Sequence, residues 1–351
     1  MGKYEHYHQH EHIKILFVLK KRNYDKGVSY GLKTSCNLVA TALEKYGIDS
    51  KIVEVFDGNC IDREVYHYKP THVFLEAFWV EPKKVKELLK LYPKIHFYVR
   101  IHSKIPFLAH EGMSVTWIYD YAKIDMHTNN FNISFNNKQA VRDFEQSMGI
   151  KSVYAPNIYL FNKLEHVTPN LGCHLRIGCF GANRELKNAL NQALAAIEFA
   201  DENDFLIEFH INVSSVEKGG EGIVKNLRSL FRHSRHRLVE WSWMSHSLFL
   251  ELVKTMDLGM TVSFSESFCI VAADFVSQNI PIVGSKEIEF LNHLYVADPS
   301  DVTDIKRKLS FAYYAGFINL QRLNEYGLHR HNERAIKEWL ELLHVCKYHN
   351  E

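Results

Sequence analysis

The chain has 351 residues, 46% of them hydrophobic and 24% charged, a balance typical of a globular protein with two domains rather than one. Its 42 basic and 41 acidic side chains nearly cancel, which excludes a protein drawn to nucleic acid or membrane by overall charge. No apolar run approaches the ~18 residues that span a bilayer, and the polar start MGKYEHYHQHEH lacks a signal-peptide core. We therefore expect a cytoplasmic protein without a membrane span. Six scattered cysteines without a C-x-x-C pair predict reduced thiols and no zinc site.

The first half of the chain alternates predicted strands and helices. IKILFVLK (13–20) is apolar throughout, as expected of a strand buried on both faces. LKTSCNLVATALEKYG (32–47) has apolar residues at helical spacing and ends at Gly47. Further elements are strands at 50–55, 71–78, 94–101, 131–135 and 152–155, and helices at 82–92 and 138–148. This βαβ order predicts a parallel sheet with helices on both faces.

The same pattern restarts after the connector FNKLEHVTPNLG (161–172). The predicted strands are 173–181, 204–211, 237–241, 258–262 and 281–284, and the predicted helices are 185–200, 223–232, 246–255 and one after Glu266. We expect two Rossmann-like doubly wound domains, 1–165 and 173–325, facing across a cleft, and a C-terminal helix over 326–351 that packs on the first domain. Ligands of such sheets bind outside the carboxyl ends of the strands.

The stretch SFSESFCIVAADFVSQNIPIVGS (263–285) sets two carboxylates around the start of an apolar helix. Burying a carboxylate costs several kcal/mol unless a partner compensates it. The amides of Phe268, Cys269 and Ile270 are predicted first-turn donors, which with the helix dipole favour a phosphate. Glu266 and Asp274 would lie roughly 12 Å apart along the axis, which suits the reach from sugar to ribose in a nucleotide-diphosphate sugar. A bound ligand would then supply hydrogen-bond partners for both carboxylates.

Several segments resemble one family. ESFCIVAAD followed by NIPIVGS resembles the Glu-x7-Glu signature and trailing segment of retaining GT-B glycosyltransferases, especially glycosyltransferase family 4. YAPNIYLF (154–161), IGCFGANRELKNALNQALAAI (177–197), GVSYGLKTSCNLVATALEKYGIDSKIVEV (27–55) and VRIHS (99–103) are similar to further loose motifs of that family. The resemblance covers most of the chain.

The resemblance implies transfer of a sugar, hexosyl or pentosyl, from a nucleotide-diphosphate donor such as a UDP-sugar to a hydroxyl, with retention of configuration. It implies no cofactor beyond the donor, and the leaving phosphate as the base. Glu266 would contact donor-sugar hydroxyls, His102 would line the sugar pocket and Asp274 would hold the ribose. The other implied donor-binding groups are Arg184, Lys187, the amides of Phe268 and Cys269, and the backbone at Gly27 and Gly31. No D-x-D motif is present, so we expect Arg184, Lys187 and the helix start to neutralise the diphosphate without a metal.

Each of these residues also has a plain structural explanation. Glu266 could be a first-turn acid favoured by the helix dipole, and Asp274 a solvated helix residue. Arg184 and Lys187 could be an exposed pair, His102 a hydrogen-bonded core histidine, and the glycines turn residues. The sequence also departs from the family, because the second acid is Asp rather than Glu and Cys269 stands where glycine is common.

The stretch KNLRSLFRHSRHRLVEW (225–241) is the densest basic segment of the sequence. Its plain interpretation is a solvated helix face and loop. Alternatively Arg228, Arg232 and Arg235 contact the phosphates of a nucleic-acid acceptor. Glycosyltransferases that decorate hydroxymethylated phage DNA share the GT-B architecture, and a viral enzyme of that kind would act in the host cytoplasm. The acceptor is thus either a glycan or small molecule, or a hydroxymethylated base in DNA.

Two other functions remain open at this point. One is a non-catalytic nucleotide- or sugar-binding protein of the same fold, which donor hydrolysis would distinguish from an enzyme. The other is a phosphorylase of similar architecture, although the sequence shows no lysine motif for pyridoxal phosphate. The sequence does not fix the oligomeric state.

Overall fold

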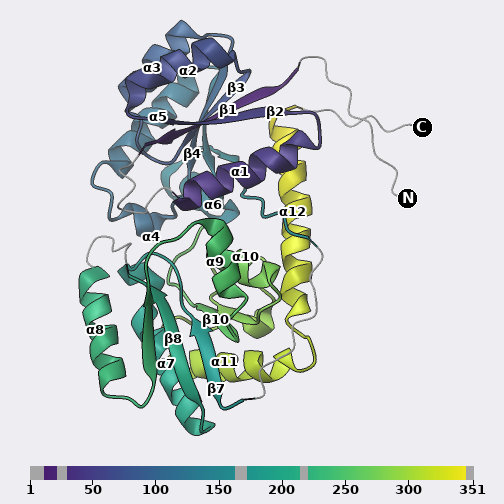
Figure 1. Ribbon diagram of the computed structural model, residues 1–351. Helices are drawn as coiled ribbons and strands as arrows, with labels where there is room; N and C mark the ends of the chain where they lie inside the picture. The colour runs from purple at the N-terminus through teal and green to yellow at the C-terminus, as the bar shows by residue number, and fades with distance from the viewer. Residues whose placement is uncertain (1–11, 22–29, 163–171, 214–219, 345–351) are drawn as a thin grey trace, which may run out of the picture. The chain divides into compact units, whose positions relative to one another are not determined.

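The computed structural model describes residues 12–21, 30–162, 172–213 and 220–344. These residues form two compact α/β units, each with its own parallel sheet (Figure 1). The first unit contains the described residues up to 160 together with 332–344, and the second contains the described residues between 161 and 331. The C-terminal helix therefore begins in the second unit and ends in the first.

The first unit is built on a six-stranded parallel sheet in the order β2-β1-β3-β4-β5-β6. The strands are β1 (Lys14–Lys20), β2 (Asp49–Val55), β3 (His72–Glu76), β4 (His96–Ile101), β5 (Phe131–Phe135) and β6 (Val153–Tyr154). The centre of β1 is buried on both faces, because helices cover both sides of the sheet. Strand order reverses between β1 and β3, which is where ligands of doubly wound sheets bind.

Helices cover the two faces of this sheet unequally. One face packs against α2 (Ile61–Tyr68), α3 (Pro82–Leu91), α5 (Ser114–His127) and α6 (Lys138–Met148). The other face packs against α1 (Tyr30–Glu44) and the end of α12 (Arg322–Leu342). The short elements are η2 (Gly58–Cys60), which leads into α2, and α4 (Ile105–Leu108), which follows β4. Two apolar layers thus enclose the sheet.

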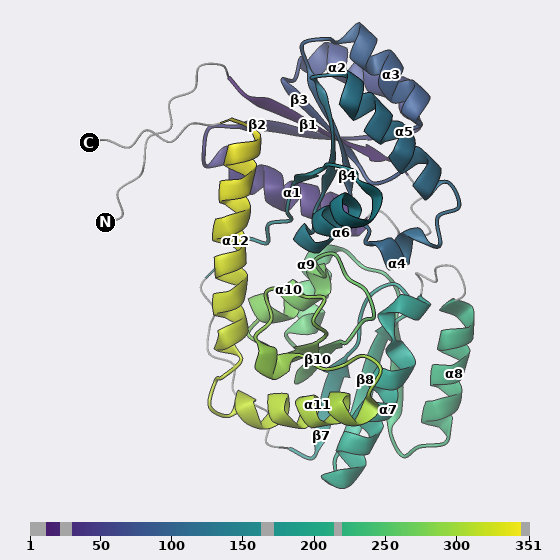
Figure 2. The same cartoon turned by 180° about the vertical axis from the view of Figure 1, so that it is seen from behind.

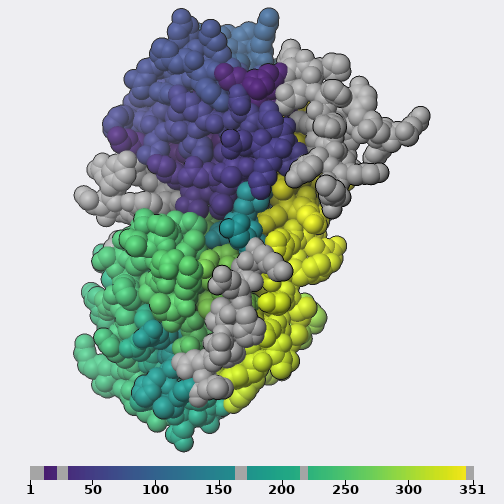
Figure 3. Space-filling model, turned by 45° about the vertical axis from the view of Figure 1, so that its right-hand side comes forward, coloured from purple at the N-terminus to yellow at the C-terminus, as the bar shows by residue number. Residues whose placement is uncertain are grey.

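The end of α12 belongs to the core of the first unit. Trp339 is fully buried, its ring packs against Phe17 and Phe74, and its Nε1 donates a hydrogen bond to the Pro156 carbonyl at 2.8 Å. The Arg100 guanidinium lies over the same ring. The opposite side of the helix is exposed and contributes to the surface shown in Figure 3. This C-terminal segment is therefore an integral part of the fold.

The second unit is built on a five-stranded parallel sheet in the order β11-β10-β7-β8-β9. The strands are β7 (His174–Gly178), β8 (Leu206–Asn212), β9 (Arg237–Trp241), β10 (Leu258–Thr261) and β11 (Ile282–Gly284). One face carries α7 (Ala189–Glu202), α8 (Gly220–Arg232) and α11 (Val302–Gly316), and the other carries α9 (His246–Val253) and α10 (Ile270–Ser277) (Figures 1 and 2). The single-turn elements are η3 (Glu185–Lys187) and η4 (His293–Tyr295).

Two glycines bring α10 unusually close to its sheet. A Cβ on Gly259 of β10 would lie 2.5 Å from the Phe275 ring of α10, and one on Gly178 of β7 would lie 2.7 Å from that ring. Real Cβ atoms do not approach this closely, so both strands need glycine for the ring to pack against them. This contact fixes the position of α10 over the end of β7 and the first half of β10.

Most predicted elements are confirmed, including β5, α6 and β9 with the predicted bounds. The prediction missed α2 and α5. In α5 the exposed Val115, Tyr119 and Met126 are apolar like the buried face, so no 3.6-residue period is visible in the sequence. In the described residues, none of the helices combines the length and the apolar character that crossing a membrane requires.

Candidate functional site

The loops after β7 and β10 and the last residue of β8 come together at the carboxyl edge of the second sheet. The Phe264 amide after β10 donates to the Leu186 carbonyl in η3 at 2.9 Å, and the Gly181 amide after β7 donates to Asn212 Oδ1 at the end of β8 at 3.0 Å. Asn188 Nδ2 donates to the Val262 carbonyl at 3.0 Å. Because each hydrogen bond joins loops from different strands, the edge is held in one arrangement.

Glu266 and Lys187 form a buried ion pair within this edge. Lys187 Nζ donates to Glu266 Oε1, with side-chain exposures of 18% and 6% respectively. Burial alone would raise the pKa of Glu266, but the charges of Lys187 and Arg184 outweigh it and lower the pKa below its usual value. The site therefore holds an ionised carboxylate beside two cationic side chains. Lys187 has three donors, so it can bind a second anion while contacting Glu266.

A small hollow opens beside this pair. Its lining includes Gly181, Asn183, Lys187, Thr261 and Ser263. Gly181 has φ +128°, and a Cβ there would lie 3.9 Å from Lys187 Nζ, so glycine leaves the backbone exposed next to the amine. A loop of this kind can bring backbone amides close to a phosphate.

The start of the helix at the predicted anion site needs correction. The helix α10 begins at Ile270, so Phe268 precedes it and the first-turn donors start two residues later than expected. Cys269 caps the helix with φ 66°, a left-handed conformation that favours glycine and explains why glycine is common at this position in the resembling family.

The helix predicted over 185–200 begins later, at Ala189, so Lys187 does not lie on it and Arg184 does not lead directly into it. Arg184 precedes the 3₁₀ turn η3, and Lys187 is the last residue of that turn. The left-handed Asn188 (φ 57°) separates the turn from α7. Residues three apart eclipse one another in a 3₁₀ turn. Both side chains still act on Glu266, since both lower its pKa.

The predicted ribose ligand Asp274 is paired with a residue that the sequence analysis did not single out. Its Oδ1 accepts a hydrogen bond from His246 Nε2 at 2.6 Å. The Asp274 side chain is 2% exposed and the His246 side chain is 33% exposed. The hydrogen bond to Asp274 raises the pKa of His246. No local sequence signal marks His246, because its partner lies 28 positions away.

The predicted residue His102 lies in the first unit, within a buried network at the carboxyl edge of that sheet. His102 Nε2 donates to Glu76 Oε2 at 2.5 Å, and Asn136 Nδ2 donates to its Nδ1 at 3.2 Å. Glu76, fully buried, also accepts from Arg100 at 3.2 Å. Burial lowers the pKa of His102, so the neutral ring bridges Glu76 and Asn136. Both ring nitrogens are engaged by the protein. Glu76 was not predicted, although an acid ending a buried strand is a visible signal.

The two predicted glycines contribute less. Gly31, near the start of α1, has no atom within 4 Å of the position that a Cβ would take, so its space is open. Gly27 lies outside the described residues.

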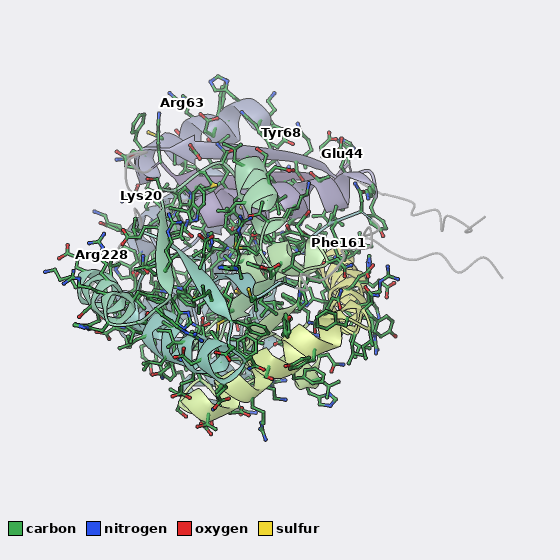
Figure 4. All side chains as sticks on the ribbon, turned by 60° about the horizontal axis from the view of Figure 1, so that its bottom comes forward. Lys20, Glu44, Arg63, Tyr68, Phe161 and Arg228 are labelled. Atoms are coloured by element: carbon green, nitrogen blue, oxygen red, sulfur yellow. The ribbon has the colours of Figure 1, made fainter. Side chains whose placement is uncertain are left out.

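The basic segment is largely charge-compensated. Arg228 points outward from α8 (Figure 4) and makes two 2.7 Å hydrogen bonds to Glu240. Arg235 pairs with Asp201 at 2.9 Å. Arg232 is exposed at the end of α8. The segment therefore presents less uncompensated positive charge than its sequence suggests.

A larger hollow of about 600 Å³ lies at the amino ends of β7, β8 and β9, away from the carboxyl edge. Arg176, Glu208 and Arg237 face one another in register across the three strands there. Glu208 pairs with Arg237 at 3.0 Å and with Arg176 at 3.5 Å. Cross-strand ion pairs of this kind suit a solvated sheet face.

Within the described ranges, no group of three or more His, Cys, Asp or Glu could hold a metal ion.

Several solved structures are similar to this chain over most of its length. Sucrose-phosphate synthase from Thermosynechococcus elongatus is similar over 95% of this chain and 98% of its own, with 11% identity and a TM-score of 0.66. An α,α-trehalose-phosphate synthase (UDP-forming) from Burkholderia vietnamiensis matches over 96% and 97%, with 11% identity and a TM-score of 0.62. A mutant of S. aureus TarM, solved in a complex that includes UDP, matches over 77% and 55%, with 11% identity and a TM-score of 0.58. No protein-family model and no curated protein matches the sequence.

These similarities confirm the predicted fold class. The chain has the GT-B fold, with two Rossmann-like units and a helical C-terminal tail. At 11% identity they show the fold alone.

Proposed function

We propose that this protein is a glycosyltransferase that moves a sugar from a nucleotide-diphosphate donor to a hydroxyl acceptor. One observation carries the proposal: in a GT-B fold, the ionised Glu266 is buried against Lys187 and near Arg184, beside the start of α10. A protein that only needed a stable core would gain little from burying this ion pair, because desolvation offsets most of its attraction.

The charges at this edge match the parts of such a donor. Lys187, Arg184 and the first amides of α10 are positive and suit the diphosphate, whose charge grows as the glycosidic bond breaks. Glu266 is negative and suits the sugar hydroxyls, which donate well to a carboxylate. These cations supply the stabilisation that a divalent ion supplies in other transferases, so the proposed reaction is metal-independent, and by the family resemblance it retains configuration.

A UDP-sugar is the donor that we propose first. The trehalose-phosphate synthase is described as UDP-forming, and TarM was solved with UDP. We propose a glycan or small-molecule hydroxyl as the acceptor. The pairing of Arg228 with Glu240 and of Arg235 with Asp201 weakens the case for DNA.

The test combines binding with turnover. UDP titrated calorimetrically into the wild type should bind, and Lys187→Ala and Arg184→Ala should each weaken binding by about 1.5–3 kcal/mol, as expected for hydrogen bonds to charged groups. The matched control is Lys254→Ala, because Lys254 is a half-exposed lysine paired with Glu251 in the same unit. UDP release from UDP-sugars separates an enzyme from a non-catalytic binding protein. Equal UDP affinity in all four proteins would contradict the assigned phosphate site.

A further inference from the structure

His246 and Asp274 form a pair next to the proposed donor site. His246 is the first residue of α9 and follows the capping residue Ser245, and Asp274 lies in α10. Both helices follow strands of the same sheet, β9 and β10, so both begin at its carboxyl edge. The pair therefore belongs to the same edge as Glu266 and Lys187.

Asp274 is almost wholly buried, whereas its partner His246 reaches the surface. Every residue of α10 from Ala272 to Ser277 is buried, and the Asp274 side chain is 2% exposed. A buried carboxylate requires a hydrogen-bond partner, and His246 Nε2 is one at 2.6 Å. His246 keeps a third of its side chain exposed, so it lies between Asp274 and solvent.

The position of the pair along α10 suits a nucleoside diphosphate. Ile270 and Asp274 are four residues apart, which is about 6 Å along a helix axis. A diphosphate at the start of α10 would thus place the next part of an extended ligand, its ribose, about one helical turn farther along. His246 is a partly exposed side chain paired with α10 at that level.

We propose that His246 binds the ribose hydroxyls of the nucleoside diphosphate, and that Asp274 is a positioning residue that acts through His246. This inference rests on the proposed function. Because Nε2 donates to Asp274, imidazole geometry places Nδ1 on the side of the ring away from Asp274. Toward a ribose hydroxyl, Nδ1 acts as an acceptor when the ring is neutral and as a donor when it is protonated.

The charged groups packed around this histidine favour its protonated form. Among the described residues, Asp274 is the ionisable group that shifts the His246 pKa, and the shift is upward. On α9 itself, Glu251 and Lys254 pair with each other toward the far end of the helix. Beside α10, burial raises the pKa of the capping residue Cys269 to about 12, so its thiol is uncharged. A protonated His246 therefore adds positive charge beside the anionic ligand, and UDP affinity should fall as pH rises through its pKa.

The test compares three ligands with and without His246. His246→Gln keeps a donor near the position of Nε2 for Asp274 and removes Nδ1, and His246→Ala is the second variant. The ligands, titrated calorimetrically, are UDP, 2′,3′-dideoxyuridine diphosphate and inorganic pyrophosphate. His233→Ala is the control, since His233 is an exposed histidine of the same unit beyond the end of α8.

We expect both His246 variants to bind UDP about five- to tenfold more weakly than the wild type, the effect of one hydrogen bond. At alkaline pH, where the His246 ring is neutral and only its hydrogen bond is lost, the dideoxy nucleotide should bind the His246 variants as well as it binds the wild type, and the same should hold for pyrophosphate. Asp274→Asn, which keeps an acceptor but lowers the His246 pKa, should move the pH midpoint of UDP binding downward.

Two results would overturn the inference while leaving the proposed function intact. One is unchanged UDP affinity in His246→Gln and His246→Ala. The other is an equal loss for all three ligands, which would show a structural effect on the whole site. If the wild type bound no UDP or other nucleoside diphosphate, the proposed function would fail first, and this inference with it.

Discussion

The two units each bury a glutamate at the carboxyl edge of a parallel sheet, but its partners differ between them. In the first unit Glu76 is fully buried and contacts Arg100 and His102, and the Arg100 guanidinium also donates to the carbonyls of Ala155 and Pro156. In the second unit Glu266 contacts Lys187, whose side chain is partly exposed and lines a small hollow.

This difference separates a carboxylate that serves the fold from one that can serve a ligand. Glu76, Arg100 and the 155–156 backbone satisfy one another inside the protein, so the network stabilises the fold. Glu266 and Lys187 retain exposed area, and the lysine has donors enough for a second partner, so a ligand can join them. Burial of an acid at the carboxyl edge of a sheet is therefore insufficient to assign a ligand site. The identity and exposure of its partner decide whether a ligand can join the pair.

The largest expected effect on stability lies in the first unit. Arg100→Ala should lower the free energy of unfolding by about 3–5 kcal/mol, because it leaves Glu76 charged and buried without its main partner. Urea denaturation measures the change, with Arg63→Ala as the control, since Arg63 is an exposed arginine paired with Glu64. A loss in Arg100→Ala as small as the control's would show that Glu76 does not depend on Arg100.

A second prediction concerns the strained cap of α10. Cys269→Val should destabilise the protein by about 1–2 kcal/mol and weaken UDP binding, because a β-branched residue fits a φ of 66° poorly. Cys269→Ala is the matched control, because alanine keeps the Cβ without branching. Equal stability of the two variants by urea denaturation would mean that the cap does not constrain the site.

The sequence predicted the fold well where hydrophobic periodicity is strong. It singled out Glu266 because the loop before an apolar helix is recognisable in sequence, and Lys187 through the family resemblance of 177–197. The structure places the two in contact. It did not predict the start of α10 at Ile270, since the left-handed Cys269 has no sequence signal other than replacing a glycine. His246 was missed because the pair with Asp274 is made by tertiary packing of α9 on α10, which no local pattern encodes.

A smaller effect is expected from the pH dependence of stability. Asp274 raises the His246 pKa in the folded protein, so the pair stabilises most below the unfolded pKa, and this contribution is lost as pH rises through the folded pKa. The wild type should exceed His246→Gln in unfolding free energy by up to about 1 kcal/mol at acid pH, and by less at alkaline pH. A difference independent of pH in urea denaturation would count against the pairing.

The smallest effect is expected at the basic segment. Because Arg228 and Arg235 are paired with acids, duplex DNA should bind this protein no more tightly than it binds a neutral control protein at low salt. A clear salt dependence of binding that flattens when Arg228, Arg232 and Arg235 are replaced by alanine would restore a DNA acceptor.

The central claim is that Glu266 acts on the donor sugar, and the turnover of a Glu266 variant tests this most directly. With a UDP-sugar donor, Glu266→Ala should lower the rate of UDP release on the order of 10²-fold or more. Its UDP affinity, measured by calorimetry, should persist, because the phosphates contact other groups. Glu251→Ala, an exposed glutamate of α9, serves as the control. EDTA should leave the wild-type rate largely unchanged. Full turnover in Glu266→Ala would contradict the account.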